Sequence, residues 1–573
     1  MPHRNTLPRA VVPGWVALLA LAICAPLFAR GYVLTYDMVW VPHLDLHRSE
    51  LWGLDSALPR AVPSDALVAL LGGVLPSMLV QKLVLFGALV GIGLGADQLV
   101  RQRPLPARLA AVTFAVWNPL VAERLLLGQW PLLIAYAGLF WLLAALCRED
   151  GPRWGVVTIA LAATALTPVT GVMGVLVGVV AAWRRGAIRV GIIAVSLNLP
   201  WIVASLLQPD PGRSDPAAVA AFDLQGEGSL GRVGSALTLG GIWNSDVVPT
   251  SRTLGIAVLF AVLTGLVVAV GMVVLFRGER RLAVVLTVIG TIGVAVALSG
   301  WLFPDLVQRV VEDVPGGGII RDGTRWLVLL APLEVVALGA GVCALVESSW
   351  ASWKIPAALL VAVLPVAALP DLAWGGGGAL RAVSYPAEWS EARDAISDST
   401  VPGDLVSLPF SAYRAPRWNE GRTVIDPAGR YFDRTTVTND ELNVGRLTIA
   451  GEDPRAVSVR KALASSDPLL RLAQVGIGLA VVDTEAPGAD EALAAMTSAD
   501  ELELNGTALR IFVIPGADPA PVSSGDRRWT ILAWSVAGLS LALGLCGAVR
   551  KRMSRPGWTD VDTAGEERAS GLA

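Results

Sequence analysis

The sequence predicts a polytopic α-helical membrane protein that carries a small α/β domain near its C-terminus. Of its 573 residues, 54% are hydrophobic and only 16% are charged, and the mean hydropathy is +0.59. Soluble domains contain about 25% charged residues. Long apolar segments separated by short arginine-bearing loops cause this bias, and one long polar stretch lies near the C-terminus. The composition therefore argues against a cytosolic enzyme.

The net charge and the cysteine positions exclude further classes of partner and of site. The formal net charge is −3, whereas nucleic-acid binding requires a concentrated basic surface, so no nucleic-acid partner is expected. The four cysteines, Cys24, Cys147, Cys343 and Cys546, all lie in or beside apolar segments. Because none lies in the polar stretch, neither a disulfide framework nor a cysteine-based zinc site is expected there.

Apolar segments of suitable length predict about twelve transmembrane helices. Arg4 and Arg9 precede the first segment as in a signal peptide, but residues 11–29 approach the roughly 20 residues that cross a bilayer and lack a convincing small-x-small cleavage site. We therefore interpret them as the first span. The predicted spans lie near residues 11–30, 80–99, 107–121, 131–147, 154–168, 170–184, 189–207, 254–276, 281–302, 325–346, 354–373 and 529–549.

The distribution of basic residues predicts the orientation in the bilayer. With the N-terminus inside, five of the six inward segments are rich in Arg or Lys, and every long loop faces outward. This pattern predicts a multi-pass plasma-membrane protein with both termini in the cytoplasm. The module spanning residues 1–373 carries an outward loop at 31–79, and residues 550–573 form a cytoplasmic tail. Within that loop, Leu67–Leu79 is too short to cross and predicts a helix at the outer interface.

Residues 374–528 predict an extracytoplasmic α/β domain, which precedes the final span at 529–549. Short strands are expected at 404–410, 478–483 and 509–514. Helices are expected at 388–397 and 465–475, the second with Asp467-Pro468 as its cap and first turn.

Asp37 is the candidate catalytic residue of the first outward loop. It lies between Tyr36 and Trp40, close to the predicted membrane surface. Aromatic residues at that depth are ordinary interfacial anchors, whereas a carboxylate there is placed to accept a proton from a hydroxyl group. Capping of an interfacial helix is the alternative role, and the sequence does not separate the two.

His43 and His47 form a candidate metal site in the same loop. They stand four residues apart, so on a helix their rings share a face, and Asp37 and Asp45 could add oxygen ligands for Mg²⁺ or Mn²⁺. Hydrogen-bonding surface histidines are the alternative, which we favour.

Two further segments place ionisable residues at the outer boundary. After Pro119, which is expected to end or kink the third span, Glu123, Arg124 and Gln129 are candidate substrate-binding residues. An ion pair that orders the turn is the alternative role of Glu123 and Arg124.

Arg321 and Arg325 follow three consecutive glycines just before a span. If a helix begins there, they share one side and suit a phosphate group, which the helix N-terminus also favours. Arginines on the outward side oppose the positive-inside bias and need a negative partner, such as a lipid phosphate. Pairing with Glu312 and Asp313 in the same loop is the alternative.

Three motifs together resemble the GT-C superfamily of integral-membrane glycosyltransferases. They are Leu34-Thr-Tyr-Asp-Met38, Trp117-Asn-Pro-Leu-Val-Ala-Glu-Arg-Leu-Leu-Leu-Gly-Gln-Trp130 and Arg321-Asp-Gly-Thr-Arg-Trp326. The last two are similar to actinobacterial members, including arabinofuranosyltransferase-like proteins of the cell envelope, and the likeness covers spans one to eleven. Asp37 matches the position of the family's catalytic acid. Many members have paired acids in this loop, whereas the carboxylate nearest to Asp37 in the sequence is Asp45.

The resemblance implies an inverting transfer of a sugar from a polyprenyl-phosphate donor to a cell-envelope glycan or lipid acceptor at the outer face of the lipid bilayer. Asp37 would accept the proton of the acceptor hydroxyl, and Arg321 and Arg325 would hold the donor phosphate. Glu123, Arg124, Gln129 and Asp45 would complete the substrate site. Residues of the exported domain would hold the acceptor glycan or else form the domain core: Tyr413, Arg417, Trp418, Tyr431 and Arg434.

Two other classes of function stay open from the sequence. A transporter or flippase for lipid-linked sugars typically shows internal repeats and ionisable residues at mid-membrane depth. No repeat is evident, and Glu334 is the main intramembrane exception to charges that gather at the outer boundary. A non-catalytic membrane protein that uses the exported domain in envelope assembly is the other alternative.

Overall fold

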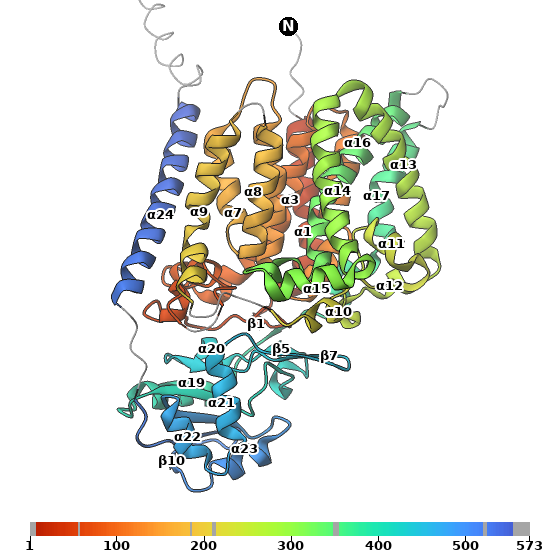
Figure 1. Cartoon of the computed structure of the whole chain (residues 1–573). Coiled ribbons are helices and arrows are strands. Elements are labelled where there is room, and N and C mark those ends of the chain that lie inside the picture. The colour runs from red at the N-terminus through yellow and green to blue at the C-terminus, as the bar shows by residue number, and fades with distance from the viewer. Residues whose placement is uncertain are drawn as a thin grey trace, which may run out of the picture.

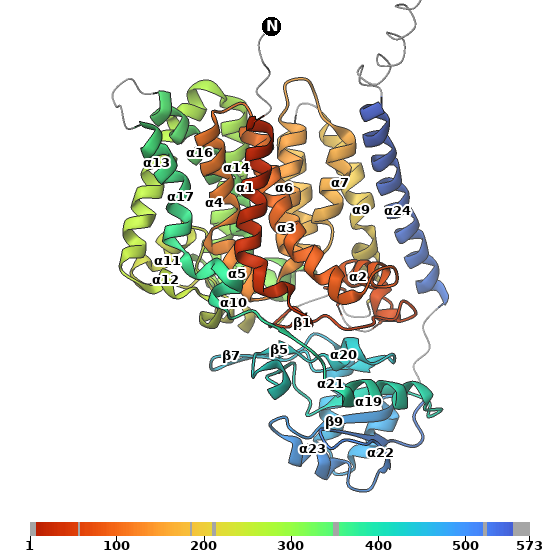
Figure 2. The same cartoon turned by 180° about the vertical axis from the view of Figure 1, so that it is seen from behind.

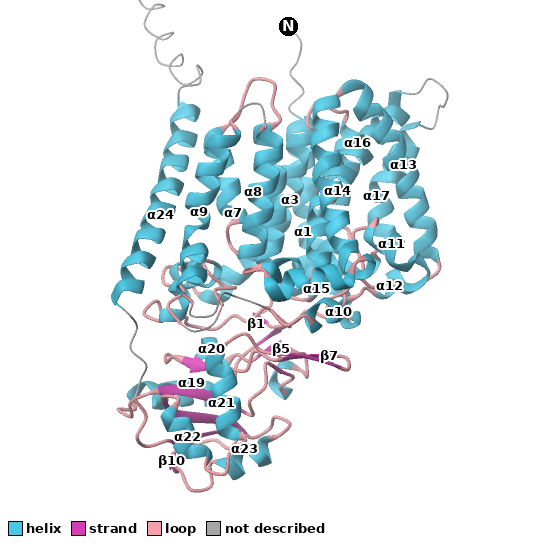
Figure 3. Cartoon of the chain, viewed as in Figure 1, coloured by secondary structure: helices cyan, strands magenta, loops and turns pink. Residues whose placement is uncertain are grey.

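The computed structural model describes residues 7–55, 58–183, 186–208, 214–347, 354–518 and 524–553. A bundle of long helices forms one part of the molecule, and a domain built around a β-sheet lies against one end of it (Figures 1 and 3). Helix α1 (Leu7–Cys24) begins, and helix α24 (Ser524–Met553) ends, at the other end of the bundle (Figure 2). From residue 554 on, the predicted tail lies outside the described residues.

In the described parts of the chain, eight helical segments are long and apolar enough to cross a membrane, and a pair bent by 65° would make a ninth. Three shorter apolar helices coincide with the other predicted spans. The structure therefore supports a multi-pass membrane protein, and the count of twelve stays a prediction. The bundle helices after α1 are α3 (Ser77–Val100), α4 (Leu105–Val116), α5 (Pro119–Leu126), α6 (Trp130–Leu146), α7 (Trp154–Thr164), α8 (Pro168–Ala182), α9 (Ala187–Leu207), α13 (Ile256–Gly278), α14 (Arg280–Leu302), α16 (Ala331–Glu347), α17 (Lys354–Ala368) and α24.

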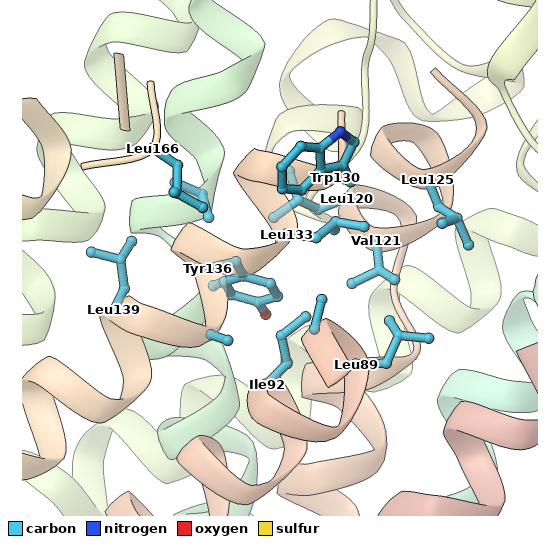
Figure 4. Close-up of a cluster of buried hydrophobic side chains, with 14 of the residues drawn as sticks. Leu89, Ile92, Leu120, Val121, Leu125, Trp130, Leu133, Tyr136, Leu139 and Leu166 are labelled. Atoms are coloured by element: carbon cyan, nitrogen blue, oxygen red, sulfur yellow. The ribbon is translucent and has the colours of Figure 1, made fainter. Parts of the chain in front are cut away.

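The core of the bundle is apolar and closely packed. Figure 4 shows part of it, where Leu89 of α3, Val121 of α5 and Tyr136 of α6 meet, all fully buried. Helices α13 and α16 approach backbone to backbone because both contribute glycine at the contact. A Cβ atom on Gly271 would lie 1.7 Å from the carbonyl oxygen of Ala337. Small residues of this kind allow close helix packing in membranes.

Short helices cover the end of the bundle that faces the sheet domain (Figure 1). Among them α2 overlaps the first half of the segment 67–79, where an interfacial helix was expected, and Val74 just beyond it is 83% exposed. These helices are α2 (Ser64–Gly72), α10 (Ala217–Ala221), α11 (Gly231–Ala236), α12 (Thr250–Thr253), α15 (Pro304–Asp313) and α18 (Ala373–Gly377).

Polar side chains of α3 fix the chain where it leaves the first span. The Lys82 ammonium donates to the carbonyl oxygens of Leu27, Ala29 and Gly31 at 2.6, 2.6 and 3.0 Å. Carbonyl groups at a helix end otherwise lack partners, and an ammonium can donate three hydrogen bonds. Lys82 thus closes the end of α1 and anchors the start of the loop that carries Asp37.

The third span is interrupted by Asn118, as the sequence predicts for the Asn-Pro pair. The side-chain oxygen of Asn118 accepts from the Val121 N–H at 3.0 Å, and its amide nitrogen donates to the Phe114 carbonyl at 2.8 Å. Pro119 occupies the first turn of α5, where its missing N–H costs nothing. The break gives α5 its own direction and brings Arg124 to the end of the bundle.

The C-terminal polar stretch folds around a five-stranded mixed sheet in the order β10–β11–β9–β3–β6. Strand β9 runs parallel to β3 and antiparallel to β11, and its first six residues are buried, as expected for a central strand. Strands β3, β9 and β11 coincide with the three strands expected from the sequence, whereas β6 and β10 were not predicted. Their bounds are β3 (Asp404–Leu408), β6 (Thr436–Val437), β9 (Ile477–Asp483), β10 (Asp500–Leu502) and β11 (Leu509–Val513).

Helices accompany this sheet in the same part of the chain. Helix α22 begins at Asp467, whose carboxylate accepts from the Leu470 N–H at 3.2 Å, as the sequence predicts. The helices are α19 (Ala387–Asp398), α20 (Ala428–Tyr431), α21 (Pro454–Leu463), α22 (Pro468–Gln474) and α23 (Ala489–Ala495).

Three small antiparallel strand pairs complete the domain and join it to the bundle. Strand β1 (Tyr32–Val33), from the loop after α1, pairs with β2 (Ala382–Val383) of the C-terminal part. Tyr36 exchanges backbone hydrogen bonds of 2.7 and 2.9 Å with Thr423 and Ile425. The first outward loop is therefore part of the interface with the sheet domain. The other two pairs are β4 (Tyr413–Arg414) with β5 (Val424–Ile425), and β7 (Leu442–Val444) with β8 (Leu447–Ile449).

Candidate functional site

Asp37 lies where the first outward loop passes between the bundle and the sheet domain. Its backbone N–H donates to the Leu127 carbonyl at 3.1 Å. The preceding residue, Tyr36, has φ +37°, which is uncommon for a residue other than glycine. Gly128 has φ +79° and lies against this loop, with the space for a Cβ atom filled by the backbone of Thr35 and Met38. The backbone of the loop is thus fixed from both sides.

Both carboxylate oxygens of Asp37 accept hydrogen bonds from side chains. Gln129 Nε2, at the start of α6, donates to Oδ2 at 3.0 Å, and Tyr413 Oη, from β4 of the sheet domain, donates to Oδ1 at 2.7 Å. Side chains of the bundle and of the sheet domain therefore orient the Asp37 carboxylate. These contacts are not those of a helix cap.

Gln129 links Asp37 to a buried arginine. Its side-chain oxygen accepts from Arg124 Nη1 at 3.0 Å, and Arg124 Nη2 donates to the Thr324 hydroxyl at 2.6 Å. The Arg124 side chain is 1% exposed and lies 3.5 Å from Asp322. A buried guanidinium needs such partners to offset the loss of water.

Asp322 continues the network to Arg325. Arg325 Nε lies 2.9 Å from Asp322 Oδ2, and the Thr324 hydroxyl donates to Asp322 Oδ1 at 2.7 Å. Burial raises the pKa of Asp322, but the charges of Arg124 and Arg325 outweigh it and hold the pKa below its usual range. The Arg325 side chain is 33% exposed. A continuous polar network thus runs from Tyr413 through Asp37, Gln129, Arg124 and Asp322 to Arg325.

Arg321 takes a different direction from Arg325. The chain forms short 3₁₀ helices here, η5 (Gly317–Ile320) and η6 (Gly323–Leu329), instead of the single helix that would place both arginines on one side. Arg321 Nη1 lies 2.5 Å from Glu452 of the sheet domain, which also pairs with Arg60 of the first loop. The observed partners of the pair are thus Glu452 and Asp322, and the expected alternatives, Glu312 and Asp313, are not among them.

Glu452 bridges two arginines from loops of the membrane part. Burial raises the pKa of Glu452, but the charges of Arg60 and Arg321 lower it to about 2. Burial and the neighbouring Arg60 lower the pKa of Arg321 to about 10. Both groups remain charged at neutral pH, so the sheet domain holds a carboxylate between two guanidinium groups beside the Asp37 network.

Glu123 does not join this network. Its carboxyl group contacts that of Glu227, and Glu227 accepts from Arg252 Nε at 2.6 Å. In the described part of the chain no ion pair joins Glu123 with Arg124, because adjacent residues on a helix point in different directions. Glu123 and Arg124 therefore belong to two separate clusters and do not form the ion pair that was the alternative expectation for this turn.

His43 and His47 do not form a metal site with their neighbours. His47 Nδ1 lies 2.8 Å from Asp45 Oδ1, and the His47 side chain is 94% exposed. Burial raises the pKa of Asp45, but the N–H groups and charge of His47 lower it overall. Across the residues that the structure describes, no three His, Cys, Asp or Glu side chains gather as a metal site would require. His43 and His47 fit the surface role, and Asp45 is engaged with His47.

The five residues of the sheet domain that were expected to hold an acceptor glycan differ in what they contact. Trp418 and Tyr431 pack with Tyr385, and Tyr431 is only 3% exposed, so these two belong to the core. Arg434 donates to the Gly403 carbonyl at 2.8 Å. Of the five residues expected to hold an acceptor glycan, Tyr413 is the one that contacts Asp37, whereas Arg417 is exposed.

A small hollow opens beside Asp37. Trp40 and Trp130 line it with ring centroids 5.6 Å apart, and so does the ion pair between Asp65 of α2 and Arg430 of α20. The Trp40 ring is 1% exposed, and its Nε1 has no hydrogen-bond partner among the described residues. Sequence reasoning missed Arg60, Asp65, Arg430 and Glu452, because no local pattern marks a residue whose partner lies in another part of the fold.

Comparisons with known proteins identify the fold. No protein-family model matches the sequence, and no curated protein matches it. A cryo-EM structure of arabinofuranosyltransferase AftD from Mycobacteria is similar with a TM-score of 0.54 and 15% sequence identity, over 90% of this chain and 40% of that one. A mutant of AftD gives a TM-score of 0.53 over 89% of this chain and 41% of that one, also at 15% identity.

A crystal structure of an Archaeoglobus fulgidus oligosaccharyltransferase gives a TM-score of 0.39 at 11% identity, over 84% of this chain and 70% of that one. The chain spans about two fifths of the length of the AftD structure. Over most of its length the chain has the fold of the AftD structures, and the resemblance stated from the sequence is supported at the level of the fold.

Replacing Gly128 with Ala tests the packing behind Asp37. A Cβ atom there would lie 2.5 Å from the Met38 nitrogen and from the Thr35 oxygen, so we expect Gly128→Ala to lower the free energy of unfolding by about 3 kcal/mol or more. Gly316→Ala is the matched control, because Gly316 has φ +77° with nothing within 4 Å, and should cost only about 1 kcal/mol. Equal losses in thermal unfolding of the detergent-solubilised proteins would contradict the assigned packing.

The Glu452 bridge predicts an acid-sensitive contact between the two parts of the molecule. The pKa of Glu452 is about 2 in the folded protein against an ordinary 4.5, so its contribution is complete above pH 4.5 and is lost as the pH falls toward 2. Glu452→Gln should lower the unfolding temperature at pH 7 and reduce its fall between these pH values. The control is Glu441→Gln, which removes a more exposed pair with Arg460 and should have little effect. An unchanged acid profile in Glu452→Gln would rule out this role.

Proposed function

We propose that the protein is a membrane glycosyltransferase that moves a sugar from a polyprenyl-phosphate donor to a cell-envelope glycan or lipid acceptor. One observation carries the proposal: Asp37 and Arg325, 288 positions apart in the chain, lie in one network at the end of the bundle. A transfer reaction requires residues with complementary chemistry, a proton acceptor and phosphate-binding cations, to be held close together. The similarity of fold to AftD, an arabinofuranosyltransferase, supports this class of function.

Asp37 acts as the general base in the proposed reaction. Its carboxylate accepts the proton of an acceptor hydroxyl as the hydroxyl oxygen attacks the anomeric carbon. The bond between that carbon and the phosphate oxygen breaks, and the polyprenyl phosphate leaves with the electron pair. A single displacement of this kind inverts the configuration at the anomeric carbon.

Arg321 and Arg325 receive the phosphate of the donor. Arg325 is partly exposed, and Arg321 now holds a carboxylate, that of Glu452, together with Arg60. A phosphate group presents similar oxygens with more charge and suits guanidinium groups better. In our proposal the donor phosphate therefore replaces Glu452, and the arginines stabilise the charge that develops on the leaving group.

The orientation in the membrane follows from the same proposal. Residues 374–518 and the Asp37 loop lie at one end of the bundle, and α1 begins and α24 ends at the other (Figure 1). In this proposal the protein lies in the plasma membrane. The excess of Arg and Lys in the short loops supports placing both of its termini in the cytoplasm. The site then faces the outside, where envelope glycans are assembled.

The Asp37→Asn variant tests the catalytic assignment. Asparagine keeps the size of the side chain but cannot accept the proton, so we expect the transfer rate to fall by about 10²-fold or more. The assay follows radiolabelled sugar from polyprenyl-phosphoryl arabinofuranose, and then from related pentose and hexose donors, in protein reconstituted with envelope glycans. Asp305→Asn, on exposed α15, is the control. Transfer by Asp37→Asn at the wild-type rate would refute the assignment.

The Arg321→Gln variant tests the donor site. Loss of a charge-assisted contact should raise the dissociation constant of the polyprenyl-phosphate donor by about 10- to 100-fold. Binding is measured by competition with a fluorescent donor analogue, which needs no turnover. Arg417→Gln removes an exposed arginine of the sheet domain and should leave donor affinity unchanged. Equal affinities for wild type and Arg321→Gln would remove the phosphate-site proposal.

A further inference from the structure

The backbone of the sheet domain places Tyr413 against Asp37. Tyr413 pairs with Ile425 in the β4–β5 pair, and the Ile425 N–H in turn donates to the Tyr36 carbonyl at 2.9 Å. Tyr36 also donates its N–H to the Thr423 carbonyl at 2.7 Å. Strand β5 therefore connects β4 on one side with the residue before Asp37 on the other. The contact of 2.7 Å between the Tyr413 hydroxyl and Asp37 is built on these backbone bonds.

The Tyr413 hydroxyl is the donor in its contact with Asp37. Burial raises the pKa of Tyr413 well above its usual value, and the negative charge of Asp37 raises it further. The hydroxyl therefore keeps its proton at neutral pH. Its ring also packs edge-on against Tyr36, with centroids 6.2 Å apart.

We infer that Tyr413 is a positioning residue that orients the Asp37 carboxylate for proton transfer, so that the C-terminal domain completes the active centre of the membrane part. The inference rests on the proposed function. Gln129 holds one oxygen and Tyr413 the other, so the plane of the carboxylate is set by one donor from each part of the molecule. Two fixed donors keep a catalytic group in its productive geometry at no cost during the reaction.

This arrangement makes catalysis depend on docking of the domain. Without the domain, the Asp37 carboxylate would lose the Tyr413 hydrogen bond and would be free to turn about Cα–Cβ, with Gln129 as its remaining side-chain partner. Charged groups from several elements also surround the Asp37–Tyr413 contact. They are Arg124 of α5, Arg325 of η6, Arg60 of the first loop, Asp65 of α2 and Arg430 of α20.

The Tyr413→Phe variant tests the inference in the full-length reconstituted protein. We expect kcat to fall by about 10- to 100-fold while the KM for polyprenyl-phosphoryl arabinofuranose, or for whichever donor the wild type uses, stays within about twofold. In the Asp37→Asn background the same change should have no further effect on the rate.

Tyr385→Phe is the matched control. The Tyr385 hydroxyl donates to the Trp40 carbonyl at 3.0 Å, so this variant removes a hydrogen bond of the same kind between the domain and the first loop without touching Asp37. Its kcat and KM should match the wild type. If Tyr413→Phe lowers the unfolding temperature but keeps the wild-type kcat, Tyr413 is structural and the inference is wrong. If the wild type transfers no sugar, the proposed function fails first.

Discussion

The buried charge of Arg124 is the constraint on which the candidate site depends. A guanidinium that is 1% exposed at the end of an apolar bundle is stable only when hydrogen-bond acceptors surround it. Those acceptors come from Gln129, Thr324 and Asp322, which belong to different segments. The hydrogen bonds and ion pair of Arg124 therefore join the turn after α5 to the 3₁₀ segment before α16. Through Gln129 they also reach Asp37, so the geometry of the site follows from the cost of leaving the charge without partners.

The interface between the bundle and the sheet domain follows the same rule. Arg48 of the first loop is buried, and it donates to the Phe432 carbonyl of the domain at 3.0 Å while Glu50 accepts from it at 2.9 Å. Arg60 and Arg321 meet Glu452 in the same region. Charged and polar groups thus join the two parts of the molecule at several points. An apolar cluster also crosses the interface, because Leu34 and Met38 of the first loop belong to the same buried cluster as Phe432 of the domain. The polar contacts are the part of this interface that a substrate of matching charge can replace.

The sequence predicts the location of the long helices well, because they have a local signature. It also draws attention to three ionisable residues that the structure joins in one polar network. Apolar runs mark the spans, and Asp37, Arg124 and Arg325 are conspicuous as ionisable groups at the membrane boundary. Partners are not predictable in this way. Arg321 and Arg325 diverge because the backbone forms 3₁₀ turns there, and Glu123 contacts Glu227, which lies 104 positions further along the chain. Glu452 carries no local signal at all, since its role comes from two arginines in loops of another part of the fold.

The most direct test of the account is a cryo-EM structure of the protein in lipid nanodiscs with a polyprenyl phosphonate analogue of the donor, which cannot transfer its sugar. The account predicts phosphonate density within hydrogen-bond distance of Arg321 and Arg325, Glu452 displaced from Arg321, and the anomeric carbon facing the carboxylate of Asp37. Density for the headgroup elsewhere on the bundle, with Glu452 still bound between Arg60 and Arg321, would contradict it.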